Sequence, residues 1–188
     1  MAVHLGNLEY ECLKCRRVYS LVQQRSNGFC SECNSLLYPR RQPNCWVFQF
    51  SQEKYRWFDW ILDHPEDEER WVVSRYTKNI LAGDKVAVWS SGNKSGVYAL
   101  SEILTNPEKK PLTKEQENYW IDKSEAQKFG YRYSVALKYL RIFVENPVLS
   151  EKCTINPDLK YMSVLIQPQG TNFTLTRHQW NTLLDLTE

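Results

Sequence analysis

Histidine is scarce in this chain, which has only His4, His64 and His178 among 188 residues. None of the three lies in the arrangement of a catalytic triad or a metal site. The chain also lacks the G-x-S-x-G, P-loop, Rossmann glycine and H-E-x-x-H patterns. The acidic run at 66–69 is typical of a solvated loop. We therefore expect a protein that is not an enzyme, with a hydrolytic enzyme as an alternative.

Long apolar runs are absent as well. No stretch approaches the roughly 18 apolar residues that a membrane-spanning helix requires. The N-terminal stretch MAVHLGNLEYECLK has no basic segment followed by an apolar one, so it does not look like a signal peptide. Six cysteines, four of them in the spacing of a metal site, fit a reducing compartment. We expect a cytoplasmic protein with no membrane partner.

The chain also lacks a large excess of charge of one sign. The chain has 24 Lys and Arg against 22 Asp and Glu, a net charge of +2. A protein that coats nucleic acid through phosphates alone needs a basic excess, because each neutralised phosphate requires a cation. If this protein binds nucleic acid, its affinity must come largely from a shaped site, with a modest salt dependence.

Two C-x-x-C pairs are the clearest feature that is present. Cys12 and Cys15 form the first pair, Cys30 and Cys33 the second, and residues 16–29 separate them. This spacing is typical of a four-thiolate structural zinc site. Two disulfides or a redox pair are the alternative interpretations. Cys45 and Cys153 lie outside the quartet, and each is expected to be a small buried hydrophobe.

The cysteines define a first domain. Residues 8–38 predict a zinc ribbon, whose short segments between cysteines need the metal for stability. Residues 39–44 form a Pro- and Arg-containing linker, or else an ordered strap along the following domain. Residues 45–188 form the second domain. In the zinc ribbon, Lys14, Arg16 and Arg17 flank the first knuckle and are candidates for contacts with a nucleic-acid backbone.

Hydrophobic periodicity predicts the elements of the second domain. Residues 46–51 read as a buried strand, and a helix ends at His64-Pro65. Further strands are expected at 71–74, 85–90, 97–104 and 131–144. Residues 105–129 read as a polar excursion with one helical turn, 159–165 as a short helix, and 177–186 as a final helix capped by Thr176. This pattern predicts an α+β fold around a small curved sheet or barrel, with peripheral helices.

Three stretches combine aromatic and polar residues. WVVSRY begins at Trp71, VWSSG surrounds Trp89, and QPQGTNF begins at Gln167. The third can direct backbone and amide groups at a small planar ligand. Together with GDKVAVWSSGNKSGVYALSEI and IQPQGTNFTLTRHQW, these stretches resemble the EVE domain, a member of the PUA-like superfamily related to YTH domains. The resemblance runs from about Trp46 to Leu186, and it does not include the zinc ribbon.

The resemblance implies a PUA-like mixed β-barrel and a non-enzymatic reader of a modified, flipped base. Carried over by matched position, it implies an aromatic cage with a polar loop. The pocket residues are Phe50, Ser51, Trp71, Trp89, Ser90, Gln169, Gly170, Thr171 and Asn172. Related YTH cages use a further tryptophan, for which Trp120 is the candidate here. Arg75, Lys78 and Lys94 border the implied mouth and are candidates for contacts with phosphates.

The family resemblance makes DNA the expected ligand and a modification-dependent restriction or defence system the expected setting, with a nuclease or ATPase as partner. Two alternatives stay open at this point. One is an RNA-binding PUA-like module with the same fold. The other is a protein-interaction adaptor, in which the zinc ribbon captures a partner and the aromatic residues only form the core.

Overall fold

The computed structural model describes residues 9–20 and 28–187, which fall into two compact units, 1–42 and 43–188. In the first unit, β1 (Glu9–Cys12) lies between β2 (Val18–Ser20) and β3 (Leu37–Pro39) in an antiparallel sheet. Its small core consists of Cys12, Cys30 and Leu37, with two tyrosines packed against them. So few apolar residues give little stability by burial, so this unit needs another source of stability.

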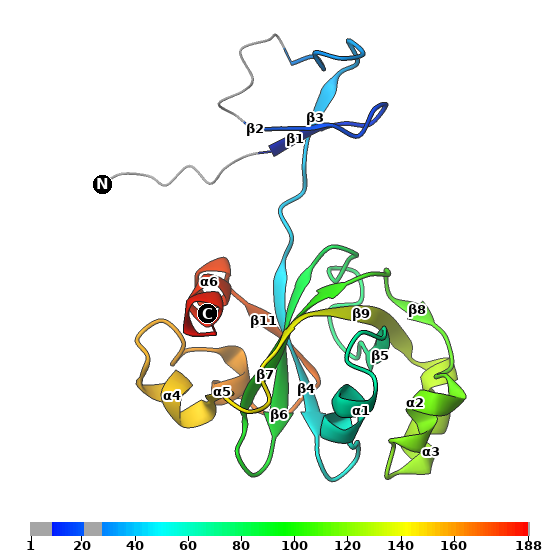
Figure 1. Ribbon diagram of the computed structural model, residues 1–188, viewed down its shortest axis with the longest axis vertical. Coiled ribbons are helices and arrows are strands. Elements are labelled where there is room, and N and C mark those ends of the chain that lie inside the picture. The colour runs from blue at the N-terminus through cyan, green and yellow to red at the C-terminus, as the bar shows by residue number, and fades with distance from the viewer. Residues whose placement is uncertain (1–8, 21–27, 188) are drawn as a thin grey trace. The chain divides into compact units, whose positions relative to one another are not determined.

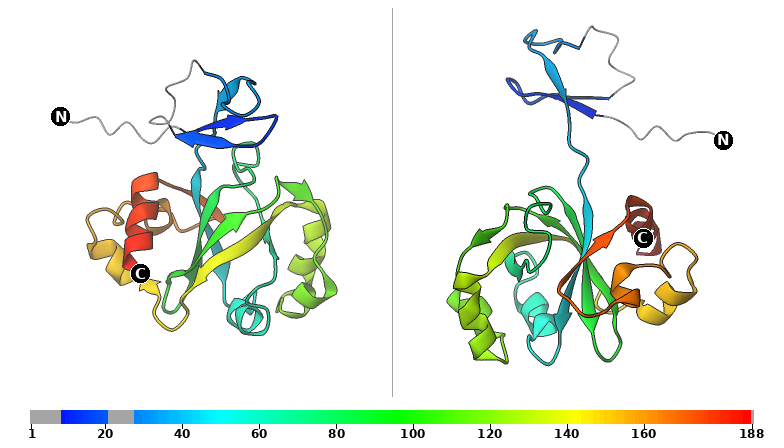
Figure 2. Two further views of the ribbon diagram at one scale, coloured as in Figure 1. Left: turned by 45° about the horizontal axis from the view of Figure 1, so that its top comes forward. Right: turned by 180° about the vertical axis from the view of Figure 1, so that it is seen from behind.

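The second unit is built on one curled sheet, shown in Figures 1 and 2. Its strand order is β11-β4-β6-β7-β9-β5, with β10 paired to β7 and β8 paired to β9. The strands are β4 (Cys45–Ser51), β5 (Glu69–Val72), β6 (Lys85–Ser91), β7 (Gly96–Ile103), β8 (Glu108–Lys109), β9 (Tyr133–Ile142), β10 (Val148–Leu149) and β11 (Asn172–Leu175). Among the described strands of this sheet, β4 and β6 are the pair that runs in parallel.

Helices cover both faces of this sheet. They are α1 (Trp57–Asp63), α2 (Lys114–Asn118), α3 (Lys123–Gln127), α4 (Ser150–Ile155), α5 (Ser163–Ile166) and α6 (Arg177–Leu186), with the 3₁₀ helix η1 (Lys128–Tyr131). One face packs against α1, and the other packs against α4, α5 and α6 (Figure 1). The predicted α+β fold with a curved sheet and peripheral helices is confirmed. None of the helices in the described ranges is long and apolar enough to cross a bilayer.

Alternation along the strands separates the two cores. In β4, Trp46, Phe48 and Phe50 belong to the core under α1, whereas Cys45 and Val47 belong to the core under the C-terminal helices. Successive side chains of a strand point to opposite faces, so a strand buried on both sides is apolar throughout. This explains why residues 45–48 are apolar without interruption.

A buried aspartate joins the starts of the two parallel strands. Asp84 accepts hydrogen bonds from the backbone N–H of Asn44 at 2.8 Å and from Trp46 Nε1 at 2.9 Å. It also accepts one from the N–H of Leu81 at 3.0 Å. Gly83 has φ = 87°, a conformation that favours glycine, and forms the turn that presents this carboxylate. The β4 strand therefore begins at a fixed position beside β6.

Several predicted elements are confirmed. The final helix runs over 177–186, with a capping box between Thr176 and Gln179. The helix before His64 and the strands at 45–51, 85–91 and 133–142 also agree with their predicted positions. The strand predicted at 71–74 instead covers 69–72, because its pairing with β9 runs from Glu69 to Val72.

Two predictions about helices are wrong. The helix expected at 159–165 forms only from Ser163 onward, as the short α5. The residues before it form a turn, in which the Asn156 side chain accepts from the N–H groups of Asp158 and Leu159. The sequence analysis missed α4 before this turn. Residues 105–129 hold more than one helical turn, since they include α2 and α3, capped by Thr113 and Asp122.

Candidate functional site

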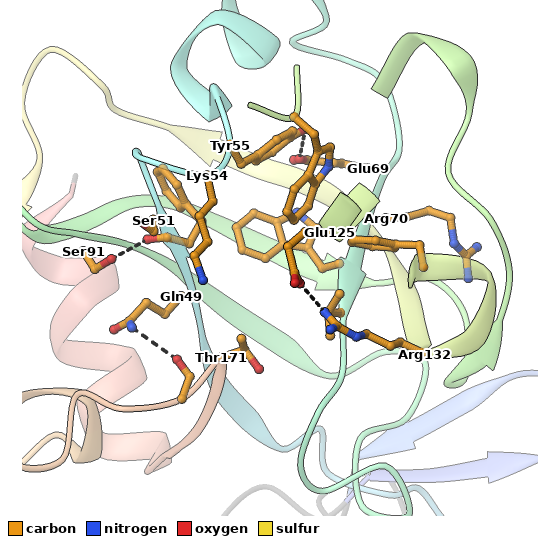
Figure 3. A pocket seen from close by; sticks show the side chains of 16 residues that line it. Gln49, Ser51, Lys54, Tyr55, Glu69, Arg70, Ser91, Glu125, Arg132 and Thr171 are labelled. Carbon is orange, nitrogen blue, oxygen red and sulfur yellow. Dashed lines mark hydrogen bonds and ion pairs between the residues drawn. The ribbon is translucent and has the colours of Figure 1, made fainter. Parts of the chain in front are cut away.

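A cavity of about 230 Å³ lies on the α1 side of the sheet, where β4 and β5 meet the segment around Trp120 (Figure 3). Five aromatic residues line it: Phe50, Tyr55, Trp71, Trp120 and Phe129. The other lining residues are Gln49, Ser51, Lys54, Glu69, Arg70, Val72, Ser91, Glu125, Arg132, Gly170 and Thr171. A lining that combines several aromatic rings with polar and charged side chains suits a small planar ligand.

The segment 114–131 closes one wall of the cavity although it is distant in sequence from β4. The N–H of Ile121 donates to the carbonyl of Lys54 at 2.9 Å, and the N–H of Arg56 donates to the carbonyl of Tyr119 at 2.9 Å. These bonds bring the rings of Tyr55 and Trp120 to a centroid separation of 4.9 Å. Trp120 Nε1 is buried and has no hydrogen-bond partner among the described residues. The indole ring of Trp120 lines the cavity, and a buried N–H without a partner calls for an explanation.

A buried carboxyl group links several of the aromatic side chains. Tyr55 donates its hydroxyl to Glu69 Oε1 at 2.6 Å, and Tyr139 donates to Glu69 Oε2. The Tyr139 oxygen in turn accepts from Trp57 Nε1 at 2.9 Å and Trp71 Nε1 at 3.3 Å. Burial raises the pKa of Glu69 to about 7, although the two phenol hydrogen bonds oppose this shift.

Charged side chains lie at the edge of the cavity. Figure 3 shows the Lys54 ammonium group directed toward the middle of the cavity. Arg132 donates to Glu125 at 2.7 Å, and Lys128 also pairs with Glu125. Lys54 and Arg132 are exposed, whereas Tyr55 and Trp71 are buried. The cavity therefore has an aromatic interior and a charged, solvent-accessible edge.

The loop before β11 forms another part of the lining. The N–H of Gln49 donates to the carbonyl of Thr171 at 2.8 Å, and its side-chain amide donates to the carbonyls of Pro168 and Gly170 at 3.0 and 3.2 Å. Asn172 is 1% exposed; it donates to the carbonyl of Val72 at 3.0 Å and accepts from the N–H of Ser74 at 2.8 Å. These bonds fix the loop against the end of β5.

The structure brings together five of the nine residues predicted from sequence to form the pocket. Those lining the cavity are Phe50, Ser51, Trp71, Gly170 and Thr171. Those outside its lining are Trp89, Ser90, Gln169 and Asn172. Asn172 holds the loop through hydrogen bonds, as described above, and Ser90 is buried and accepts from Gln52 Nε2 at 2.8 Å.

The expected pairing of Trp71 and Trp89 as two walls of one pocket needs correction. Trp71 belongs to the core under α1, and Trp89 belongs to the core under the C-terminal helices. The reason is strand alternation: Val88 faces the α1 side, so Trp89 faces the other. The second tryptophan that lines this site is Trp120, which packs against Tyr55 and which the sequence suggested only as a further tryptophan.

The three cations predicted to contact phosphates are exposed, and none lines the cavity. Arg75 lies near the loop, because its Nη1 would be 3.7 Å from a Cβ at Gly170. Lys94 is in the turn between β6 and β7, where its carbonyl accepts from the Tyr98 hydroxyl at 2.7 Å. Lys54, Arg70 and Arg132 are the cations that line the cavity, and none of them was predicted from the sequence because all three lie outside the recognised motifs.

The first unit contains a separate site. The sulfur atoms of Cys12, Cys15, Cys30 and Cys33 all lie within 4.8 Å of one another. Each pair closes a turn in which an N–H donates back to the first cysteine's carbonyl: from Arg16 at 2.7 Å in the first pair and from Asn34 at 2.9 Å in the second. Both donors have positive φ, 61° and 53°. The two pairs therefore present their thiols to one common centre.

Lys14, Arg16 and Arg17, predicted to meet a nucleic-acid backbone, are exposed in this first unit. Two of them already have acidic partners, since Arg16 pairs with Glu11 at 3.3 Å and Arg17 with Glu32 at 2.8 Å. Exposed ion pairs of this kind contribute little stability and separate readily. Their role toward nucleic acid stays a prediction.

Comparison with known proteins identifies relatives of the second unit. Residues 44–186 match the EVE domain family. A human THYN1 protein, solved in complex with DNA containing 5-methylcytosine, has a TM-score of 0.55 and 14% sequence identity, covering 77% of this chain and 98% of that one. A Pseudomonas syringae protein has a TM-score of 0.56 and 15% identity, covering 77% and 99%, respectively. A Leishmania major protein has a TM-score of 0.56 and 14% identity, covering 78% and 95%. No curated protein matches the chain. At these identities the structural matches show a shared fold.

Proposed function

The chain belongs to the EVE domain family, and from this premise we propose that it is a non-enzymatic reader of a modified base in DNA. The observation that carries the proposal is the cavity with five aromatic residues and an unpartnered indole N–H from Trp120. Its fold is similar to that of a human THYN1 protein whose structure contains 5-methylcytosine DNA.

The size of the cavity favours a single base. Sites for drug-sized ligands occupy about 300–1,000 Å³, whereas this one occupies about 230 Å³. A flipped base loses a few kcal/mol of stacking and pairing. Stacking against aromatic side chains returns about 1–3 kcal/mol per base. The aromatic interior thus supports the capture of a base that has left its helix.

Selectivity must come from polar groups as well as from shape. Burial of one additional methyl group gives about 0.8 kcal/mol, which is about a fourfold change in affinity. A buried donor left unpaired costs more, about 1–3 kcal/mol. Trp120 Nε1 is such a donor, and we infer that a correct base offers it an acceptor.

We also propose that the four cysteines hold a structural zinc ion. Tetrahedral coordination with Zn–S bonds of about 2.3 Å requires sulfur atoms about 3.8 Å apart. The Cys12–Cys33 and Cys15–Cys30 sulfur distances are both 3.4 Å, and all four thiols surround one centre. This arrangement supports a metal site over two separate redox pairs. Zinc would supply the stability that the small core of the first unit lacks.

In a cell, we propose that the protein acts with a nuclease or ATPase partner in modification-dependent restriction or defence, where the reader supplies recognition and the partner supplies catalysis. The binding test is a screen of the full chain against short DNA strands carrying methylated, hydroxymethylated, glucosylated or unmodified bases. Matched RNA strands serve as competitors. Selective binding of one modified DNA supports the proposal, and equal binding of all strands or preference for RNA contradicts it.

A matched pair of variants tests the site. Both Trp60 and Trp120 have a buried Nε1 without a described partner, but only Trp120 lines the cavity. We expect Trp120→Phe to weaken binding of the selected strand about two- to tenfold, the equivalent of one hydrogen bond. Trp60→Phe should bind like the wild type. Fluorescence anisotropy measures both affinities, and equal losses in the two variants would contradict the proposed site.

A further inference from the structure

The Glu69 carboxyl group is the unusual feature of the cavity wall. The residue is fully buried, and in the described part of the chain no lysine or arginine forms an ion pair with it. Its two oxygens accept from Tyr55 and Tyr139, which come from different segments. A buried carboxyl group without a cation has a cost of desolvation, so its retention calls for a role.

The number of hydrogen bonds that each group can accept shows how ionisation of Glu69 affects the network. The Tyr139 oxygen has two lone pairs, and the indole N–H groups of Trp57 and Trp71 occupy both. Tyr139 must therefore donate its own proton to Glu69, and Tyr55 also donates to Glu69. The ionised carboxylate accepts both protons, and every donor in the network is satisfied.

Protonation of Glu69 breaks this arrangement. A proton on Oε2 would face the Tyr139 hydroxyl, so that one indole must lose its acceptor. A proton on Oε1 would face Tyr55, whose own proton then needs another partner. Either way a buried donor is left unpaired or a ring must turn. Two of the rings concerned, Tyr55 and Trp71, line the cavity.

We propose that ionised Glu69 is a positioning residue that sets the aromatic walls of the cavity, so that base binding follows its ionisation. This inference rests on the proposed base-reading function. Its consequence is a reader that loses affinity when the solution becomes acidic. Because burial raises the pKa of Glu69 to about 7, the change falls near neutral pH.

The hydrogen-bond partners of Glu69 do not change their protonation state near neutral pH. Tyr55 and Tyr139 have pKa values raised well above their ordinary range, because burial and the neighbouring Glu69 charge both disfavour phenolate. Gln116 in α2 is neutral. Among the other lining residues, Lys54, Arg70 and Arg132 are cations, and hydrogen bonds from Lys128 and Arg132 lower the pKa of Glu125.

Indole N–H signals in NMR test the positioning role without any ligand. We expect the Trp57 and Trp71 signals of the full chain to titrate together with a midpoint near pH 7. The signals of Trp46, which donates to Asp84, serve as the internal control. Glu69→Gln should abolish the shared titration. Tyr139→Phe keeps the carboxyl group and should also abolish it, which provides a second test if Glu69→Gln fails to fold. Flat Trp57 and Trp71 signals between pH 5.5 and 8.5 would overturn the inference.

Binding measurements test the consequence. With a DNA strand carrying 5-methylcytosine as the probe, we expect affinity to fall about three- to tenfold from pH 8 to pH 6. In Glu69→Gln the affinity should be low and independent of pH. Constant wild-type affinity across this range would overturn the link to binding. Failure of every modified strand to bind at pH 8 would remove the proposed function, while the ligand-free indole titration would still decide the positioning role.

Discussion

Glu69 also affects the stability of the folded chain, in the opposite direction from its effect on binding. Its pKa is raised to about 7 in the folded protein because of burial. The folded state therefore holds the proton more tightly than the unfolded state, whose value is about 4.3. The contribution of Glu69 to the free energy of unfolding is fully present below about pH 4.3 and is lost as the pH rises through about 7.

We therefore predict that the urea midpoint of the wild type decreases between pH 5 and pH 8 through this contribution. Glu69→Gln, which stays neutral, should lack this part of the decrease. Glu145→Gln changes an exposed carboxyl group and should follow the wild type. The measurement is urea unfolding at four pH values, and parallel curves for all three proteins would count against the assignment. Ionisation of Glu69 thus lowers the stability of the folded chain, while by our proposal it orders the aromatic walls of the cavity.

At the scale of single elements, Gly96 at the start of β7 offers a sharp test of packing. A Cβ at this position would lie 2.6 Å from the carbonyl oxygen of Val148 and 2.7 Å from Leu149 Cα. Both atoms belong to the backbone of the paired strand β10, so they cannot move aside as a flexible side chain would. We predict that Gly96→Ala destabilises the protein by about 1–3 kcal/mol.

Gly130 provides the control for this substitution. A Cβ there would meet nothing within 4 Å, and its φ is not in the left-handed region. Gly130→Ala should therefore change the free energy of unfolding by less than about 1 kcal/mol. Urea unfolding at pH 7 compares the two variants with the wild type. Equal stability of the two alanine variants would show that the β7–β10 contact tolerates a side chain.

The elements show where sequence reasoning was sufficient. The helix at 177–186 was predictable because its capping box and apolar face are local in sequence. The strand at 45–51 was predictable because burial on both faces gives consecutive apolar residues at 45–48, followed by Phe50. The helix α4 was missed, because its sequence SEKCTI contains only two strongly apolar residues, of which Cys153 is buried. Its stability depends on packing that the local pattern does not display.

The candidate site was predictable only in part, for a related reason. Phe50 lies in a strand that the apolar pattern located, whereas the strand of Trp71 begins and ends two residues earlier than predicted. The face to which Trp89 points depends on the alternation of side chains along its strand. The motif that contains Trp89 does not show on which face of the sheet it lies. The contact between Tyr55 and Trp120 joins two segments through backbone bonds across the fold. No local period encodes such a contact.

At the scale of the whole molecule, the two units have separate cores of very different size. Among the residues that the structure describes, the first unit has three buried core residues, whereas the second has one extensive cluster on each face of its sheet. A unit with so little apolar burial is expected to depend on the proposed metal, since structural zinc provides about 10–16 kcal/mol in isolated fingers. The second unit should fold without it.

Removal of the metal by a chelator tests whether the two units fold and function independently of each other. We predict that the full chain releases one zinc ion per molecule to a strong chelator. Loss of the zinc should unfold the first unit and leave the second unit folded. The thermal transition of the second unit and its preference among modified bases should remain, because the cavity is formed by residues 49–171. Cys33→Ser should behave like the chelated protein, whereas Cys153→Ser, outside the cluster, should retain the metal. Calorimetry and a colorimetric zinc assay measure these results. If chelation abolishes the preference for a modified base, the zinc unit takes part in recognition itself, and the division of roles between the units is wrong.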